Sequence, residues 1–290
     1  MLFDRVSDSL TLDACSELSL LQENHSIALE IRGVVEGLKR LGASINPSSR
    51  LHQYANMFDA GEDSATFSLD RALLESSQFL AIHRALSTMS DPRPWLPTLN
   101  AACCGQALAT NVRSDSRARS DQFELFTMAC LTMAGFRAVP SEPDLRAHIG
   151  RDEVAFAAKR LRAIPKFRRN LHDACAQLAK HKIRGFAVVD LSFVNLIPKP
   201  VYVRRLEPQQ ALAAVLLNGF AEEHQRDILD ATRRPEVFGV LLHASVTGRS
   251  IQPTARFVSR RWILCAAADS EVARRLITAF QSLGRPTRAE

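Results

Sequence analysis

Two extended segments face each other in the stretch SEPDLRAHIGRDEVAFAAKRL, residues 141–161, with a turn at Gly150–Asp152 between them. Side chains alternate between the two faces of an extended chain. In the second segment one face takes Val154, Phe156 and Ala158, and the other takes Ala155, Ala157 and Lys159. We expect the first set to point into a core and the second set to face a functional site.

Helices alternate with short apolar strands on both sides of this hairpin. A helix over 120–134 ends at Gly135 and leads into the strand FRAV, 136–139. Downstream we expect helices over 167–181, 208–230 and 271–283, and strands over 186–192, 237–245 and 260–268. This order predicts an α/β fold with a mixed sheet between helices, and such sheets bind ligands at strand ends.

The N-terminal part has a different pattern. Apolar residues recur at helical spacing from Leu18 to Leu41, with Gly42 as a stop, and again from Leu69 to Met89. The runs SDPRPWLP (90–97) and TNVRSDSRARSDQ (110–122) then break the periodicity. We therefore expect a mainly helical region over 1–110, with a recognition, regulatory or partner-binding role, and an α/β domain over 118–290.

Charge is distributed unevenly within a total of +6. Residues 145–205 hold fourteen Lys or Arg against four Asp or Glu, whereas residues 1–60 hold five against eight. Clustered basic side chains bind polyanions because they release counterions from phosphates, although a solvated face is the alternative. Apolar runs reach only seven residues and the N-terminus has no secretory pattern, so we expect no membrane segment and a cytoplasmic setting.

Three chemically active residues are expected at one end of the sheet. Asp144 follows Pro143 at the start of the first segment, Lys159 ends the second, and Glu124 lies on the helix upstream. Pairing of the two strands would bring Asp144, position 157 and Lys159 together, with Glu124 over the same edge. The alternative is that Asp144 caps a turn and Lys159 is a solvated strand end.

These residues resemble the PD-(D/E)XK nuclease superfamily, whose fold is restriction-endonuclease-like. Pro143 and Asp144 match the PD element, and Ala157-Ala158-Lys159 stands at the (D/E)XK position. The resemblance covers residues 118–283 and includes the order helix, three strands, helix, strand. It implies an endonuclease that uses Mg²⁺ or Mn²⁺ to hydrolyse phosphodiester bonds, in DNA rather than RNA, with restriction and antiviral defence among its uses.

The resemblance also implies residue roles. Asp144 and the carbonyl of Ala158 would bind the metal, Lys159 would position or activate water, and Glu124 would assist through a second metal or a water. The polar residue on the following helix would be Gln177, supported by Lys180 and Arg184. The expected phosphate-backbone contacts are Arg160, Arg162, Lys166, Arg168 and Arg169.

Ala157 departs from the family pattern because its side chain cannot bind a metal. It is either an engineered replacement that inactivates the enzyme, the mark of a natural pseudoenzyme, or a sign that the acid has migrated, with Glu153 and Asp173 as candidates. A non-catalytic nucleic-acid-binding or scaffold protein is the alternative function, and an interaction protein without a nucleic-acid role is a third. A homodimer, or a partner bound through the N-terminal region, fits the nuclease hypothesis.

Overall fold

The computed structural model describes residues 11–12, 24–60, 66–105, 113–194, 201–203, 209–251, 254–266 and 270–283. In these residues a mixed eight-stranded sheet has the order β1-β8-β7-β5-β4-β3-β2, with β6 paired to β7. Its strands are β1 (Thr11–Leu12), β2 (Ala138–Pro140), β3 (Leu145–Ile149), β4 (Asp152–Arg160), β5 (Gly185–Asp190), β6 (Val201–Val203), β7 (Val237–Ile251) and β8 (Thr254–Ala266). Strands β4, β5 and β7 are parallel, and β3 is antiparallel to β4.

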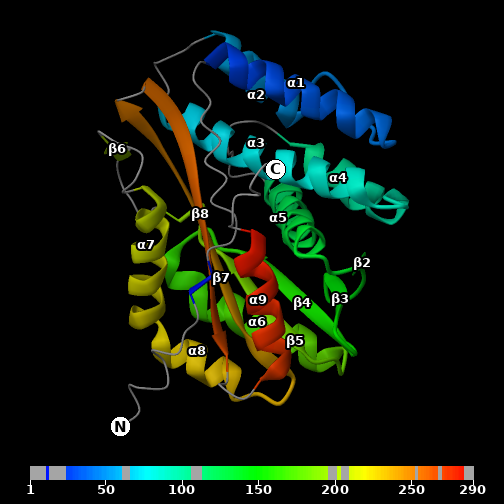
Figure 1. Cartoon of the computed structure of the whole chain (residues 1–290), viewed down its shortest axis with the longest axis vertical. Helices are drawn as coiled ribbons and strands as arrows, with labels where there is room; N and C mark the ends of the chain where they lie inside the picture. Colours follow the sequence, from blue (N-terminus) through cyan, green and yellow to red (C-terminus); the bar gives the residue numbers. More distant parts are fainter. Residues whose placement is uncertain are drawn as a thin grey trace, which may run out of the picture.

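Helices cover both faces of the sheet, which confirms the predicted α/β class (Figure 1). One face packs against α5 (Arg113–Met133) and α9 (Glu271–Leu283), and the other against α6 (Phe167–Lys180), α7 (Gln209–Glu223) and α8 (Gln225–Thr232). The predicted helical N-terminal region contains α1 (Asn24–Arg40), α2 (Arg50–Ala60), α3 (Thr66–Thr88) and α4 (Leu96–Cys103). Across the described ranges, no helix is both long and apolar enough to span a membrane.

Strand β4 divides its side chains between two apolar cores. Val154 and Phe156 lie in the core beneath α5, while Ala155 and Ala157 lie in the core beneath α6. The predicted alternation is therefore present, but the expectation that the second face is a site is wrong for Ala155 and Ala157. The physical reason is that β4 is an interior strand with a helix on each side, so both faces are buried.

The N-terminal helices partly follow the predicted pattern. Helix α1 ends at Arg40, and Gly42 adopts φ 101° where its N–H bonds to Lys39 O at 2.9 Å. Residues 13–23, which include the start of the expected helix, lie outside the described residues. Helix α3 covers the expected 69–89 segment, whereas α2 and α4 were not predicted.

Helix α5 joins the helical region to the sheet. It begins at Arg113, inside the polar run over 110–122 that we expected to separate the two regions. It packs on both α3 and α4 and also contacts β4 (Figure 1). One apolar cluster accordingly includes Ile27 of α1, Phe79 of α3, Phe123 of α5 and Trp262 of β8. The two regions share this core.

Candidate active site at the end of strand β4

A pocket of about 290 Å³ lies at the end of β4, between α5 and the first turn of α6. Nine residues line it: Ser120, Asp121, Glu124, Asp144, Ala158, Lys159, Arg160, Arg162 and Asn170. The structure thus brings six predicted site residues to the pocket: Glu124, Asp144, Ala158, Lys159, Arg160 and Arg162. It does not bring Ala157 or Gln177 to the pocket.

Asp144 is held where the pairing of β3 with β4 stops. The last paired residues are Leu145 and Phe156, and beyond them the Ala158 N–H donates to Asp144 Oδ2 at 2.6 Å. The Asp144 carboxylate therefore accepts the next hydrogen bond from β4, at the point where the backbone pairing of β3 with β4 has ended. Lys159 Nζ lies 3.6 Å from the same carboxylate oxygen, and both side chains are about four-fifths buried, with 20% and 18% exposed.

The carboxyl groups in the pocket have raised pKa values. Burial raises the pKa of Asp144 to about 6, and Lys159 and the Ala158 N–H oppose that rise. Burial also raises the pKa of Glu124 to about 8, with further increases from the negative charges of Asp144 and Asp121. Such perturbed acids in a pocket are typical of functional sites.

Asp121 is the acid that sequence reasoning missed. It lies one turn before Glu124 on α5, so both side chains share a face of the helix. Burial raises the pKa of Asp121, and its Oδ2 is buried without a hydrogen-bond partner among the described residues. The signal was the Asp-x-x-Glu spacing at the start of the helix expected over 120–134, which places Asp121 on the same helix face as Glu124.

Position 157 faces away from this pocket. Ala157 is fully buried in the core beneath α6 and pairs in register with Ala187 of β5. The two migrated acids that the sequence suggested do not line the pocket either. Glu153 is exposed and lies 3.4 Å from Arg146, while Asp173 is exposed on α6, 3.8 Å from Arg169.

The polar residue that α6 presents to the pocket is Asn170 and not Gln177. Helix α6 connects the parallel strands β4 and β5, so its first turn lies near the end of β4 and its last turn near the start of β5. Asn170 is in the first turn, where its Nδ2 donates to Lys166 O at 2.8 Å. Gln177 is near the other end, which explains why the prediction is wrong.

The predicted phosphate-binding residues fall into three groups. Arg162 lines the pocket and is exposed. Lys166, Arg168 and Arg169 are exposed at the start of α6 but do not line the pocket. Arg168 lies 3.5 Å from Asp227, and Arg169 lies 3.8 Å from Asp173. Lys180 and Arg184 are exposed but lie at the far end of α6, away from the pocket.

Arg160 is the exception, because it is buried. Its Nε donates to Asp190 at 2.9 Å and its Nη2 to Gln78 at 2.7 Å, while its guanidinium lies over the rings of Phe123 and Phe193. Arg160 lines the pocket, but these bonds hold its side chain on the α5 side of the sheet, and its contact with a phosphate backbone stays a prediction.

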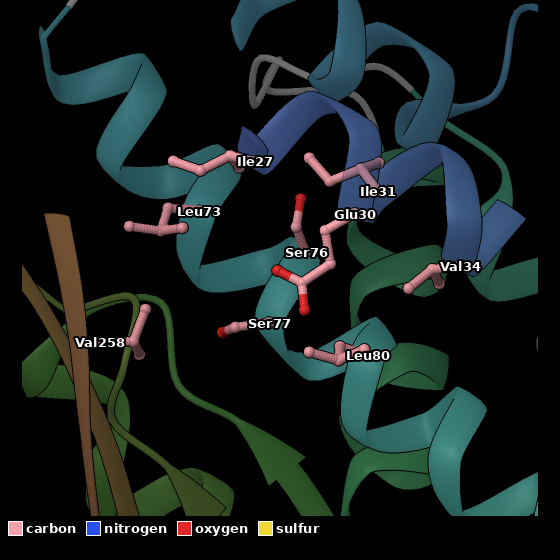
Figure 2. Close-up of a pocket in the computed structure, with 9 residues that line it drawn as sticks. All are labelled: Ile27, Glu30, Ile31, Val34, Leu73, Ser76, Ser77, Leu80 and Val258. Atoms are coloured by element: carbon pink, nitrogen blue, oxygen red, sulfur yellow. The ribbon is translucent and has the colours of Figure 1, made fainter. Parts of the chain in front are cut away.

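A second, mainly apolar hollow lies between α1 and α3. Figure 2 shows Ile27, Ile31 and Val34 of α1 on one side and Leu73 and Leu80 of α3 on the other. The Glu30 side chain points into this space, but the volume is only about 20 Å³. That is room for about one water, so the hollow is too small to be a ligand site.

Comparison with known proteins finds no match: no family model, no curated protein and no solved structure resembles this chain closely enough to assign it. Within the described residues, no group of three or more His, Cys, Asp or Glu side chains is already arranged to hold a metal ion. The chemistry of the pocket must therefore be inferred from the placement and charge of its own residues.

Proposed function

We propose that this chain is a Mg²⁺- or Mn²⁺-dependent endonuclease that hydrolyses phosphodiester bonds, with DNA as its substrate. The observation that carries the proposal is the meeting of Glu124, Asp144 and Lys159 in one pocket, with Lys159 Nζ 3.6 Å from Asp144. The order α5, β2, β3, β4, α6, β5 is also the order implied by the PD-(D/E)XK resemblance. This agreement supports a restriction-endonuclease-like core.

The donor set suits a divalent cation. Mg²⁺ takes oxygen ligands, usually carboxylates with waters and substrate phosphate. Glu124 and Asp144 would hold it, with the Ala158 carbonyl. Burial raises the pKa values of both acids, and a bound cation would stabilise their charged forms. When bound, the ion would polarise a phosphoryl oxygen and lower the pKa of a bound water.

Asp121 also offers a solution to the missing acid at position 157. Its carboxylate enters the pocket from α5, on the same helix face as Glu124, and has a buried oxygen without a partner. We therefore assign to Asp121 the charge that the (D/E)XK pattern places at position 157. On this assignment the chain cuts as it stands, whereas a chain inactivated at Ala157 does not.

The remaining residues act on the substrate. Lys159 places a positive charge beside Asp144, where it would offset negative charge that develops on a phosphate. Arg162 lines the pocket, and Lys166, Arg168 and Arg169 are exposed where α6 begins. These side chains would hold the phosphate backbone without reading its sequence.

The test is cleavage of supercoiled plasmid and of single-stranded RNA, with Mg²⁺ or Mn²⁺. We expect the unaltered chain to cut DNA, and we expect Asp144→Asn, Lys159→Met and Asp121→Asn each to reduce the rate by about 100-fold or more. Asp173→Asn is the matched control, because Asp173 is an exposed acid outside the pocket. Cutting by Asp144→Asn at the control's rate would overturn the proposal.

A second candidate is a non-catalytic nucleic-acid-binding or scaffold protein on the same fold. The observation that favours it is the absence of a carboxylate at position 157. It predicts salt-dependent DNA binding that weakens with Arg162→Ala and Lys166→Ala, and no cleavage either by the unaltered chain or by Ala157→Glu. Metal-dependent cleavage by either protein would exclude this candidate.

A further inference from the structure

Gln78 of α3 lies behind the pocket and is fully buried. Its Oε1 accepts one hydrogen bond from Arg160 Nη2 at 2.7 Å and another from Gln122 Nε2 at 2.9 Å. Arg160 directly follows Lys159 on β4, and Gln122 lies between Asp121 and Glu124 on α5. A single oxygen of the N-terminal helical region thus joins the two elements that carry the site.

Both donors are fixed by further bonds. The Gln122 amide also donates to Glu75 O at 3.1 Å, so its two N–H groups have two different acceptors. Arg160 Nε donates to Asp190 Oδ2 at 2.9 Å, and the other Asp190 oxygen lies 2.9 Å from His243 Nδ1. These contacts leave neither side chain room to rearrange without losing a buried hydrogen bond.

A second connection lies one turn earlier on both helices. Glu75 of α3 accepts from Arg119 of α5 at 2.9 Å and from Arg50 of α2 at 2.6 Å, and all three side chains are buried. Residues Glu75 and Gln78 of α3 therefore face Arg119 and Gln122 of α5 with matching spacing. This match sets the rotation and height of α5, and with them the position of Asp121 and Glu124.

We infer that Gln78 is a positioning residue for the proposed nuclease, which fixes the acids of α5 at a set distance from Lys159 of β4. The inference rests on the proposed function. It means that the N-terminal helical region helps to hold the residues of the proposed active site in place. Reacting groups must be placed closely, since an error of about 1 Å can reduce a rate by about 100-fold.

The test compares three variants of the full chain. Gln78→Met keeps the side-chain length but removes the acceptor, Gln78→Glu keeps an acceptor, and Gln53→Met on α2 is a matched control outside this contact. We expect Gln78→Met to lower kcat for plasmid cleavage by about 10- to 100-fold with little change in KM, Gln78→Glu to recover most of it, and Gln53→Met to behave like the parent. Gln78→Asn replaces Gln78→Met if the latter does not fold.

A second readout does not depend on cleavage. Crystal structures of the parent and the variants compare the distance between the Glu124 carboxylate and Lys159 Nζ, which we expect to change in Gln78→Met and to stay at the parental value in Gln53→Met. If the parent chain never cuts, the proposed function fails while this comparison still tests the positioning role. An unchanged distance in Gln78→Met, parental kcat in that variant, or no recovery in Gln78→Glu would overturn the inference.

Discussion

Two sets of acids, Glu75 of α3 and the pocket pair Glu124 and Asp144, differ in how their charge is balanced. Glu75 is fully buried, yet Arg50, Arg119 and Arg71 overcome the effect of burial and lower its pKa to about 2. Burial also dominates at Asp144 and Glu124. Lys159 opposes it at both acids and the Ala158 N–H does so at Asp144, but the pKa values still rise to about 6 and about 8. The fold therefore stabilises the charged form of Glu75 and disfavours the charged forms of Asp144 and Glu124.

This difference separates a structural role from the role that we propose for the pocket. An acid surrounded by guanidinium groups connects α2, α3 and α5, so its charge contributes to folding. A partly buried acid with little positive charge around it lowers the stability of the fold when it is charged, unless it binds a proton or a cation. Sites that keep such groups give up stability for activity.

Removing the balanced acid should have the largest effect. We expect Glu75→Gln to lower the free energy of unfolding by about 3–5 kcal/mol, because Arg50 and Arg119 are left buried without their partner. Chemical denaturation measures the loss, with the exposed Asp173→Asn as a control that stays within about 0.5 kcal/mol. A loss as small as the control's would show that the network does not support the fold.

Placing an acid at position 157 should come next. Because Ala157 is fully buried in an apolar core, Ala157→Glu adds a carboxylate with no cation beside it. We expect a loss of about 2 kcal/mol or more, with Ala157→Ser as the smaller control. Denaturation that leaves Ala157→Glu as stable as the parent would mean that the new side chain reaches the pocket, which would favour the inactivated-enzyme hypothesis.

Removing the charge of Asp144 should increase stability, in contrast to the two substitutions above. We expect Asp144→Asn to raise the free energy of unfolding by about 1 kcal/mol at pH 8, because a buried charge with too little compensation is removed. Glu142→Gln, in the same turn but exposed, serves as the control. A marked loss of stability in Asp144→Asn would place Asp144 with Glu75 as a structural acid.

The pH dependence of stability separates the two groups. The folded pKa values of Asp144 and Glu124 lie above their ordinary values of 3.8 and 4.5, so their contribution is present at low pH and is lost as the pH rises through about 6 and about 8. Glu75 has a lowered pKa, so its contribution is present above about 4.5 and is lost as the pH falls toward about 2. Chemical denaturation at pH values from about 5 to about 9 should show that the free energy of unfolding of the parent declines as the pH rises. The double variant Glu124→Gln, Asp144→Asn should show no such decline. An equal decline in both proteins would contradict this assignment.

The sequence predicted those parts of the fold that leave a local pattern. Alternation along 152–160 predicts β4, and Gly42 and Gly150, both with positive φ, mark the turns that follow a helix and a strand. Alternation does not reveal what covers each face, because that depends on how α6 packs. Ala157 was therefore placed in the site, although it lies in a core.

The missed parts depend on contacts between distant segments. Helix α5 begins in a polar run because Arg119 and Gln122 have buried polar partners on α3, a pairing that hydropathy cannot show. The same contact buries Arg160, which had looked like a surface cation. The sequence places Asp121 in the expected helix over 120–134 but does not show that it lines one pocket with Asp144. Asn170 was missed because the direction of α6 relative to β4 follows from strand pairing.

The most direct test of the pocket that contains Glu124 and Asp144 is calorimetric titration of the chain with Mn²⁺ near pH 7. The titration is done in two buffers of different ionisation enthalpy. Glu124 has a pKa of about 8, so it holds a proton at this pH and must release it when a cation binds. We predict Mn²⁺ binding with release of about one proton, loss of that release in Glu124→Gln, and loss of binding in Asp144→Asn. Absence of Mn²⁺ binding, or binding that releases no proton, would contradict the claim that this pocket is built to take a divalent cation.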